Sequence, residues 1–556
     1  EALSPLDHRS SQDYTLIQNQ LRAKINVLFS SYHKAIANLE EDYQDESALS
    51  LGLLYANLGD LILAKKYLRM SIAQGQNPSK AQMALALVNL KAGQVQAAAN
   101  LLESTTDMYP DTVHTHYPIE VTLKNSLFDI NLAQHNFHEN IIHNDSTIYQ
   151  ILFYFSPFKI FNANQSISYI RKGNANISID NISSASKELI QSAKLSNVNL
   201  NIAQAIQLAL NFQLQEANEL LLKMSKIYPR HSVVHYNLGL TFAQLGEIAL
   251  AHKHFLKSYH LDAKNYLSGV FTMMCAKLIN QENEKFNEIF IQTISLEPKN
   301  EEYDFYRALI HYNNSNFLAT YHWLERPKKD RPLYLAFDMI IAMSLNKDTL
   351  SQSYSKKLIT MLPNDILPHL LYIDSHYSKL GPKFFARKAI NHLKRQDFNM
   401  KDFYYGPFIT KYLYTQYAQV TGSLYPLREQ IKQRLSAENN SPVSLIQSLA
   451  LVDIFTQNFE EAYTLYNQLI DDYKQQSSHT LFLAAIAATG ASHPANAIAL
   501  LEIARRKSPH HNESRYALGL LHLQLQNNEG AVISFKYMSD ADFQSQYFNF
   551  NIKSEF

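Results

Sequence analysis

Two stretches of this chain decide its fold: HYNLGLTFAQLGEIALAHKHFLKSY at residues 235–259 and RYALGLLHLQLQNNEGAVISFKYM at residues 515–538. Each contains a Leu-Gly pair, then an alanine twelve positions after the glycine, then a phenylalanine four positions further on. Residues four apart lie on the same face of a helix, so each alanine and phenylalanine are neighbours on a second helix. The landmarks are Leu238, Gly239, Ala251 and Phe255 in the first stretch, and Leu518, Gly519, Ala531 and Phe535 in the second.

Each landmark residue has a size that suits its place between two antiparallel helices. Gly239 has no side chain, so we expect a neighbouring helix to approach closely there, and Ala251 allows the same on the second helix. Phe255 then fills the volume between neighbouring hairpins, and Gly246 falls where the turn needs an unrestricted backbone. A hairpin of this kind cannot bury its apolar face alone, so the pattern predicts a stack of hairpins.

The same period recurs along the chain. Pairs of landmarks 34 residues apart occur near the N-terminus, in the middle and towards the C-terminus, and prolines follow the expected second helices. We expect about twelve or more helical pairs, with the stretch 267–440 the most divergent. The repeated landmarks include Gly59 with Gly93, Ala64 with Ala98, Leu68 with Leu102, Ala217 with Ala251, and Ala497 with Ala531.

This spacing resembles the tetratricopeptide repeat (TPR), a helix–turn–helix unit of 34 residues. The resemblance implies an all-α solenoid of helical hairpins, which grows by adding repeats rather than domains. We expect an N-terminal helical arm at 1–110, an irregular insertion at 111–190, a long solenoid at 191–545 and a C-terminal tail at 546–556. The 46% apolar residues and only 14 glycines in 556 residues are consistent with a helical fold with a continuous core.

The insertion lacks the repeat landmarks. Its stretch IYQILFYFSPFKIF at 148–161 is dense in aromatic residues, and ISYIRKGNANISI at 167–179 places Lys172, Gly173 and Asn174 between two short alternating runs. That arrangement predicts a β-hairpin, so we expect a small irregular, β-hairpin-containing element near 145–185. It either packs its own aromatic residues or docks a partner, and it marks a hinge after the N-terminal arm.

Charge and cysteine content exclude several classes of function. Fifty acidic and fifty basic residues leave no net charge, which argues against nucleic acid or an anionic membrane as the main partner. The short basic runs at 328–331 and 505–507 are expected at helix ends, where cations are favoured. The single cysteine, Cys275, excludes a disulfide within the chain and is expected to be buried.

Catalytic and metal-binding motifs are missing from the sequence. It contains no phosphate-binding P-loop, no H-E-x-x-H zinc motif, no nucleophile elbow and no cysteine cluster. His231 and His235 are four residues apart and could share a helix face, but no third ligand accompanies them. We therefore expect no enzyme activity, no cofactor and no metal.

The resemblance to the TPR family implies that the fifth and ninth positions of a first helix face a ligand. Counted from Ser232 these are Tyr236 and Leu240, and the fifth positions of two later units are Phe482 and Tyr516. Such apolar side chains suit an apolar helix or another solenoid rather than a peptide carboxylate. The alternative is that these residues pack between repeats.

The C-terminal end, with YFNFNI at 547–552, and the Asn-, Lys-, Ile- and Tyr-rich composition resemble the paralysed-flagellum family. That family consists of periplasmic repeat scaffolds that build disks around a bacterial flagellar motor and help to place its stator units. The resemblance implies a periplasmic location and partners that include another TPR scaffold protein, flagellar-motor and stator components. The sequence contains no apolar run of the roughly 18 residues that a membrane helix needs. Any membrane anchor would precede Glu1.

Two other functions remain open, together with a cytoplasmic location. One is a monomeric TPR adaptor that captures a peptide, as an assembly or secretion chaperone does. The other is a regulatory subunit of an enzyme such as a peptidoglycan-acting complex.

Overall fold

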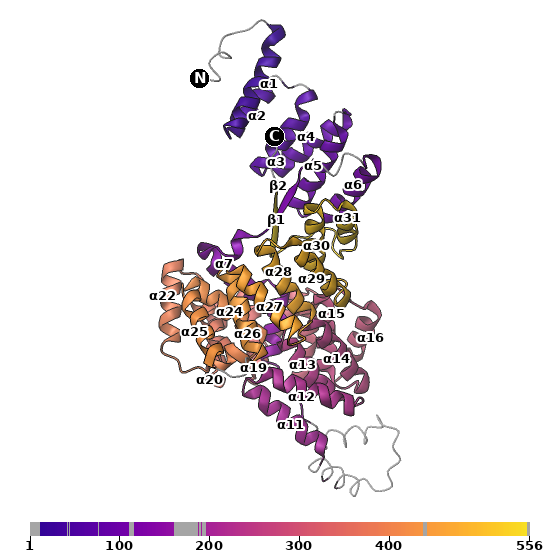
Figure 1. Cartoon of the computed structure of the whole chain (residues 1–556). Helices are drawn as coiled ribbons and strands as arrows, with labels where there is room; N and C mark the ends of the chain where they lie inside the picture. The colour runs from indigo at the N-terminus through magenta and orange to yellow at the C-terminus, as the bar shows by residue number, and fades with distance from the viewer. Residues whose placement is uncertain are drawn as a thin grey trace. The chain divides into compact units, whose positions relative to one another are not determined.

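The chain folds into antiparallel helical hairpins (Figure 1). A computed structural model describes residues 12–41, 43, 45–75, 77–110, 116–160, 187, 191, 196–437 and 442–552. The expected all-α helical-repeat fold is confirmed. The helices form two compact units, which we call the terminal unit (1–124, 492–505 and 509–556) and the central unit (125–491 and 506–508).

The terminal unit is built from both ends of the chain. Its last hairpin continues the N-terminal stack, because α31 packs against α6. The elements are α1 (Gln12–Leu28), α2 (Tyr32–Glu41), a 3-10 turn (Asp45–Ser47), α3 (Ala48–Leu58), α4 (Leu61–Ala73), α5 (Pro78–Lys91), α6 (Val95–Met108), β1 (Ile119–Leu123), α29 (Pro494–Lys507, whose last two residues belong to the central unit), α30 (Asn512–Gln524), α31 (Asn528–Lys536) and β2 (Phe548–Ile552).

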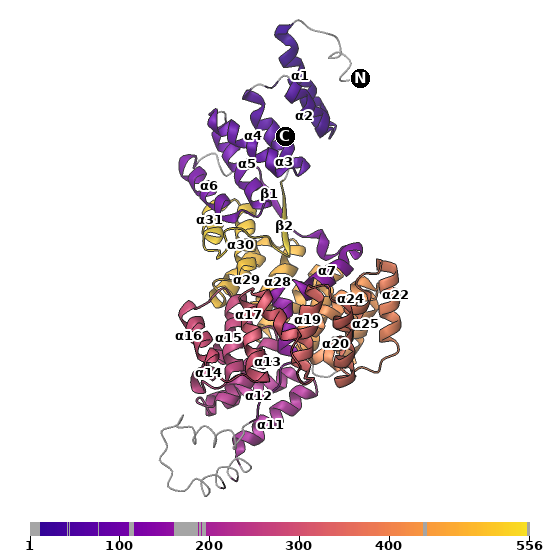
Figure 2. The same cartoon turned by 180° about the vertical axis from the view of Figure 1, so that it is seen from behind.

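Strands β1 and β2 pair antiparallel within the terminal unit (Figures 1 and 2). Leu123 lies opposite Phe548, and Val121 lies opposite Phe550, which is fully buried. The separate tail expected at 546–556 therefore differs from the structure. The alternation of Phe548 and Phe550 suits a strand with one buried face, but its strand partner is more than 400 residues away in the sequence.

The central unit is a longer stack of hairpins. Each first helix packs against the second helix that follows it, and most second helices pack against the next first helix. Its elements are a 3-10 turn (Asn125–Leu127), α7 (Ile130–Ile142), α8 (Asp145–Tyr154), α11 (Asn197–Leu210), α12 (Leu214–Ile227), α13 (Ser232–Gln244), α14 (Ile248–Leu261), α15 (Tyr266–Leu278), α16 (Glu284–Ser295), α17 (Glu301–Asn313), α18 (Phe317–Leu324), α19 (Pro332–Ser344), α20 (Asp348–Met361), α21 (Ile366–Tyr377), α22 (Pro382–Leu393), α23 (Lys401–Tyr405), α24 (Phe408–Val420), α25 (Leu424–Ala437), α26 (Val443–Phe455), α27 (Phe459–Asp471) and α28 (Ser478–Gly490).

Helices α7 and α8 occupy the segment that we expected to be irregular, which corrects that prediction. The turn between them is fixed by Asn144, whose side chain accepts hydrogen bonds from the backbone N–H groups of Ser146 and Thr147 and so caps α8. All seven residues of α8 from Thr147 to Phe153 are buried, so the helix shows no simple amphipathic period. The β-hairpin expected at 167–179 falls outside the described residues.

The packing roles expected for the landmark residues are confirmed. A Cβ atom placed on Gly239 would lie 2.9 Å from Cδ1 of Phe255, so only a hydrogen leaves room for that ring. Ala251 is fully buried beside it. Gly246 has a φ of 87°, in the left-handed region that glycine adopts without strain, and it ends the turn between α13 and α14.

Candidate functional site

The first helices of the central unit are buried far more completely than the second helices. Every residue of α13 from Val234 to Gln244 is buried, whereas α14 buries only one face. A first helix that lines an open groove would expose its inner face to solvent. Here the inner face is covered by another part of the same chain, residues 125–160, which we call the inserted segment.

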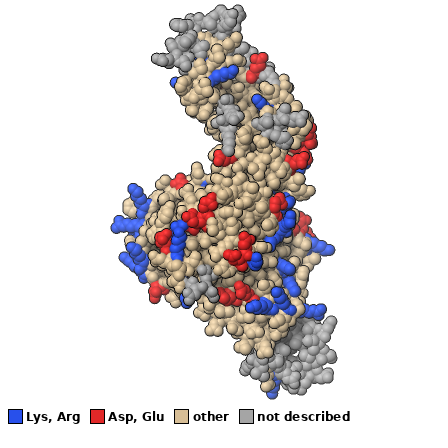
Figure 3. Space-filling view, viewed as in Figure 1, with Lys and Arg blue, Asp and Glu red and all other residues tan. Residues whose placement is uncertain are grey.

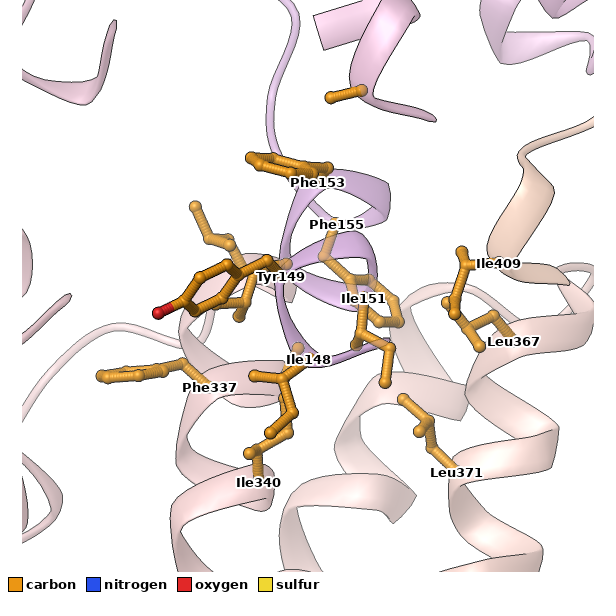
Figure 4. Packing of buried hydrophobic residues seen from close by; sticks show 14 of the residues in the cluster. Ile148, Tyr149, Ile151, Phe153, Phe155, Phe337, Ile340, Leu367, Leu371 and Ile409 are labelled. Carbon is orange, nitrogen blue, oxygen red and sulfur yellow. The ribbon is translucent and has the colours of Figure 1, made fainter. Parts of the chain in front are cut away.

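Helix α8 lies at the centre of the inserted segment and packs against α13, α15, α19 and α24. Figure 4 shows its side chains pointing in different directions: Ile148 and Tyr149 towards Phe337 and Ile340, and Ile151 towards Leu371. Helix α7 lies beside α22 and α24 (Figures 1 and 2). The inserted segment thus contacts hairpins from the beginning, middle and end of the central unit.

Polar side chains of α13 hold the backbone of the inserted segment. The Tyr236 hydroxyl donates to the carbonyl of Pro157 at 2.9 Å, and Gln244 Nε2 donates to the carbonyl of Phe153 at 3.0 Å. Asn237 bonds to Lys159 twice, donating to its carbonyl at 2.7 Å and accepting from its N–H at 2.8 Å. Through two such hydrogen bonds an asparagine side chain can bind the backbone of an extended peptide, whatever side chains that peptide carries.

Buried ionisable groups also link the inserted segment to the surrounding hairpins. Burial raises the pKa of Asp402 to about 7, with a further contribution from Asp365. Asp402 accepts a hydrogen bond from the Tyr154 hydroxyl at 2.9 Å and another from the backbone N–H of Ile366 at 2.9 Å. Its side chain therefore ties α8 to the beginning of α21.

The His138–Asp374 pair provides a second electrostatic link. His138 Nδ1 lies 2.8 Å from Asp374 Oδ2, which is fully buried. Burial alone would lower the pKa of His138, but the hydrogen bond and the charge of Asp374 raise it above its ordinary value. Nearby, Gln134 Nε2 donates to the carbonyls of Ser378 and Leu380, both at 2.8 Å. Helix α7 is thereby held at the end of α21.

The free energy of burying its apolar side chains determines whether the inserted segment could dissociate from the surrounding hairpins. Fully burying one large apolar side chain contributes about 1.5–3 kcal/mol. Helix α8 and the residue after it bury six of them, so their removal would cost as much as the whole net stability of a typical domain, about 5–15 kcal/mol. The six, none more than 6% exposed, are Ile148, Tyr149, Ile151, Leu152, Phe153 and Phe155. The inserted segment is therefore part of the core of the central unit.

The structure buries all four predicted binding residues. Tyr236 and Leu240 are 0% exposed, and Tyr236 contacts the inserted segment of its own chain. In the terminal unit, the ring of Tyr516 packs against Phe535 at 6.0 Å and against Phe543 at 5.6 Å. Phe482 is 5% exposed. Their role in binding another protein stays a prediction. The contacts seen in the structure are those of residues that pack within the chain.

Sequence reasoning missed Asn237, Gln244 and Asp402, which bind the inserted segment. Asn237 and Gln244 are polar residues of α13, but the same helix also contains His235 and Thr241, so its sequence did not single them out. Asp402 gave no signal either, because the very short helix α23 that positions it lies between repeats.

One small cavity in the central unit combines an acid, an amine and an imidazole. It has a volume of ≈ 30 Å³, and its lining includes Glu247, Lys411, Tyr466 and His479. Burial raises the pKa of Glu247 to about 7 and lowers that of Lys411 to about 7. Lys411 also donates to the carbonyl of Tyr404 at 2.8 Å. A cavity of this size holds one or two water molecules and is too small for an organic substrate.

The histidines weighed as metal ligands have other partners. His231 Nδ1 accepts from the N–H of Val234 and caps α13. His235 faces His254, with their Nδ1 atoms 3.0 Å apart, and its Nε2 lies 3.1 Å from the carbonyl oxygen of Pro229. Within the described residues, no three or more His, Cys, Asp or Glu side chains are grouped closely enough to hold a metal ion. No helix in that same portion is long and apolar enough to cross a membrane.

In the comparison with known proteins, a family model matches one part of the chain. The sequence model of the tetratricopeptide repeat family matches residues 482–542. None of the curated proteins matches this chain in sequence. These findings do not bear on the resemblance to paralysed-flagellum proteins.

Two solved structures are similar over most of their length. One is yeast Tom70, with 13% identity and a TM-score of 0.30, covering 94% of this chain and 96% of that one. The other is the Cut9–Hcn1 hetero-tetramer of the APC/C, with 12% identity and a TM-score of 0.31, covering 91% and 96%. TM-scores of this size carry no argument about function, so the fold assignment rests on the hairpins described above. Residues 482–542 match the tetratricopeptide repeat, within a chain whose described helices form mostly antiparallel hairpins.

Proposed function

We propose that this chain is a non-enzymatic scaffold for protein–protein interaction that binds its partners on outer surfaces. The observation that carries this proposal is the inserted segment, which covers the inner face of the first helices in the central unit. Because its inner face is covered, the central unit offers its outer surfaces to partners. The alternative, an adaptor that captures a peptide on the inner face, would first have to expel α8 from the core.

Hydrogen exchange on the full chain separates these two functions. If the chain is a scaffold, the backbone amides of α8 should exchange as slowly as those of α13 and α24, with or without a bound partner. If it is an adaptor, partner binding should accelerate exchange in α8, because the partner replaces it. Accelerated exchange in α8 alone would overturn the proposal.

We further propose, from the sequence resemblance, that the scaffold belongs to the periplasmic disk of a bacterial flagellar motor and helps to place stator units. The test is affinity capture of the tagged full chain from the envelope fraction of its own organism, followed by mass spectrometry. Enrichment of flagellar-motor, stator and second TPR-scaffold proteins would support this assignment. Recovery of a single soluble client without motor components would remove it and leave the more general scaffold function standing.

A further inference from the structure

Helix α22 presents an outer face with an unusual charge distribution. Its residues Phe385, Ala389 and Leu393 are buried against the central unit. The other side of α22, together with the two residues that follow the helix, carries five exposed cations and one large exposed apolar side chain, Phe384, which is 66% exposed. The five cations are Lys383, Arg387, Lys388, Lys394 and Arg395. Figure 3 shows this cluster of Lys and Arg side chains at the left edge, where Figure 1 places α22.

No carboxylate belongs to this face. Lys379 and Lys357, on neighbouring elements, form ion pairs with Asp348 and Asp330, respectively. The five cations of the α22 face form no ion pair with any residue that the structure describes. Asp397, in the turn after the helix, is the nearest acidic residue in the sequence.

Part of this face is unfavourable for the isolated chain, although Lys394 and Arg395 lie at the C-terminal end of α22, where the helix dipole favours cations. Lys383 and Arg387 are one helical turn apart, and like charges at this spacing destabilise a helix by about 0.2–0.5 kcal/mol. Other exposed helices of the central unit carry fewer cations or mix the two signs: α14 exposes only Lys253 and Lys257, and α12 combines Glu216 and Glu219 with Lys223. The repulsion on α22 would be relieved by an external partner that supplies negative charge.

We propose that the outer face of α22 docks an acidic segment of a partner protein, with an apolar side chain of that segment resting on Phe384. The face is about 18 Å long from Lys383 to Arg395, which matches a single helix or a short extended segment. An exposed aromatic side chain surrounded by cations suits a partner that is both acidic and partly apolar. This inference rests on the scaffold function proposed above, because it names one outer surface through which the scaffold would act.

A protein segment fits this face better than nucleic acid or a membrane. The chain carries no net charge, and the five cations lie on one helix and the two residues after it rather than along a continuous groove that a phosphate backbone could follow. The apolar side of α22 is already buried in the core, so the helix cannot turn it towards a lipid surface. The single Phe384 is too small an apolar area to anchor the chain there.

The test uses the full chain and a labelled helical peptide of about 16 residues that carries Glu on one face and a central Leu. Binding is measured by fluorescence anisotropy. We expect Arg387→Glu with Lys388→Glu to weaken binding by at least about tenfold, and salt raised from about 50 to about 500 mM to weaken it similarly. Phe384→Ala should weaken binding less and leave the salt dependence unchanged.

The matched control is Lys223→Glu with Lys226→Glu on α12, which makes the same change in net charge on another exposed helix of the central unit. The control should bind the peptide as the unaltered chain does. Equal loss in both double variants, or no binding of the peptide by the unaltered chain, would overturn the inference. Tighter binding to single-stranded DNA, or to phosphatidylcholine–phosphatidylglycerol vesicles, through Arg387 and Lys388 would also overturn it.

The scaffold function can be judged separately. If affinity capture recovers the same partner proteins with the α22 double variant as with the unaltered chain, the scaffold acts through another surface. In that outcome the inference about α22 fails while the proposed function stands.

Discussion

Single residues determine how closely the two helices of a hairpin pack. Gly239 lies directly under the ring of Phe255, and a Cβ atom at that position would be 2.9 Å from Cδ1. We expect Gly239→Ala to lower the free energy of unfolding by about 1–3 kcal/mol, because the ring must shift within a close-packed core. Urea denaturation followed by circular dichroism measures this change.

The control for this prediction is Gly381→Ala. An added Cβ at Gly381 meets no atom within 4 Å, and the residue does not have a positive φ. Gly381 is the N-cap residue of α22, where alanine is less favoured than glycine, but alanine also restricts the unfolded chain, so the denaturation midpoint should change little. Equal effects of the two substitutions would show that close approach at Gly239 is not what requires glycine.

A pair of histidines occurs at equivalent places in two hairpins. His235 faces His254, and His369 faces His392 with a nitrogen–nitrogen distance of 3.1 Å. In each pair the first-helix histidine also contacts the carbonyl oxygen of the proline six residues before it. This pattern requires a neutral first-helix imidazole, because its Nε2–H donates to the carbonyl oxygen and its Nδ1 must accept the hydrogen bond from the partner histidine.

Acid should therefore weaken both hairpins. Burial, together with the neighbouring histidine, lowers the pKa of His254 to about 3 and that of His392 to about 4. The unfolded chain then binds more protons below a pH of about 6.5, so these groups reduce stability as the pH falls from there towards 4. We expect His254→Gln with His392→Gln to flatten the dependence of the unfolding midpoint on pH in this window.

The comparison must be made between variants, because buried carboxyls act in the opposite direction. The raised pKa values of Glu247 and Asp402 favour the folded state as the pH falls, and they are the same in both proteins. His33→Gln, at an exposed position, serves as the control. Parallel pH curves for the double variant and the unaltered chain would exclude the histidine pairs as the source of acid sensitivity.

At the scale of elements, the turns between helices explain why some repeats were harder to detect than others. Gly59, Gly93 and Gly246 adopt positive φ at these turns, as the repeat pattern predicts. Other hairpins use the same left-handed conformation without glycine, and these turns carry no recognisable landmark. Examples are Phe212, Asn280, Ser315, Asn346, Gln457, Ser492 and Gln526.

Glycine in place of one of these residues should stabilise the chain. Gln457 joins α26 to α27, has a φ of 59° and is exposed. The left-handed conformation costs a non-glycine residue about 1–2 kcal/mol, and the extra freedom that glycine gives the unfolded chain offsets part of the gain. We expect Gln457→Gly to raise the free energy of unfolding by about 0.5–1 kcal/mol.

Chemical denaturation of the central unit, followed by tryptophan fluorescence from Trp323, would measure this effect. Gln457→Ala is the control, because alanine keeps the strained φ and should give no increase. If Gln457→Gly destabilises the chain as an ordinary surface glycine does, the turn is not strained.

At the scale of the whole molecule, the terminal unit depends on the C-terminal strand. Phe548 and Phe550 of β2 are 1% and 0% exposed, and Lys91 Nζ donates to Asn549 at 2.8 Å. Deleting residues 547–556 removes this strand and uncovers Val121 and Leu123 of β1. We expect hydrogen exchange to accelerate in α5, α6 and α31 of the terminal unit, while α13 and α24 of the central unit stay protected.

Deletion of residues 553–556 alone is the control for this truncation, since it leaves the whole of β2 in place. It should leave exchange in α6 unchanged. Unchanged exchange after the longer deletion would mean that the N-terminal hairpins hold the terminal unit together without the C-terminal strand.

The sequence by itself determined the all-α hairpin fold and the role of its landmark residues. That information is local: the spacing of Gly239, Ala251 and Phe255 lies within a single hairpin and depends only on helix geometry. The resemblance to the repeat family likewise predicted that Tyr236 and Leu240 line the inner face, and their role in binding a partner stays a prediction.

Only the tertiary structure decided what covers that inner face. The inserted segment contacts hairpins far away in the sequence: Gln419 Nε2 donates to the carbonyl of Leu127, and the ring of Phe459 lies 5.8 Å from that of Phe128. The pairing of β1 with β2 likewise joins segments from opposite ends of the chain. Local periodicity carries no information about such contacts. Many apolar segments show the same periodicity, and only the folded chain determines which of them pack together.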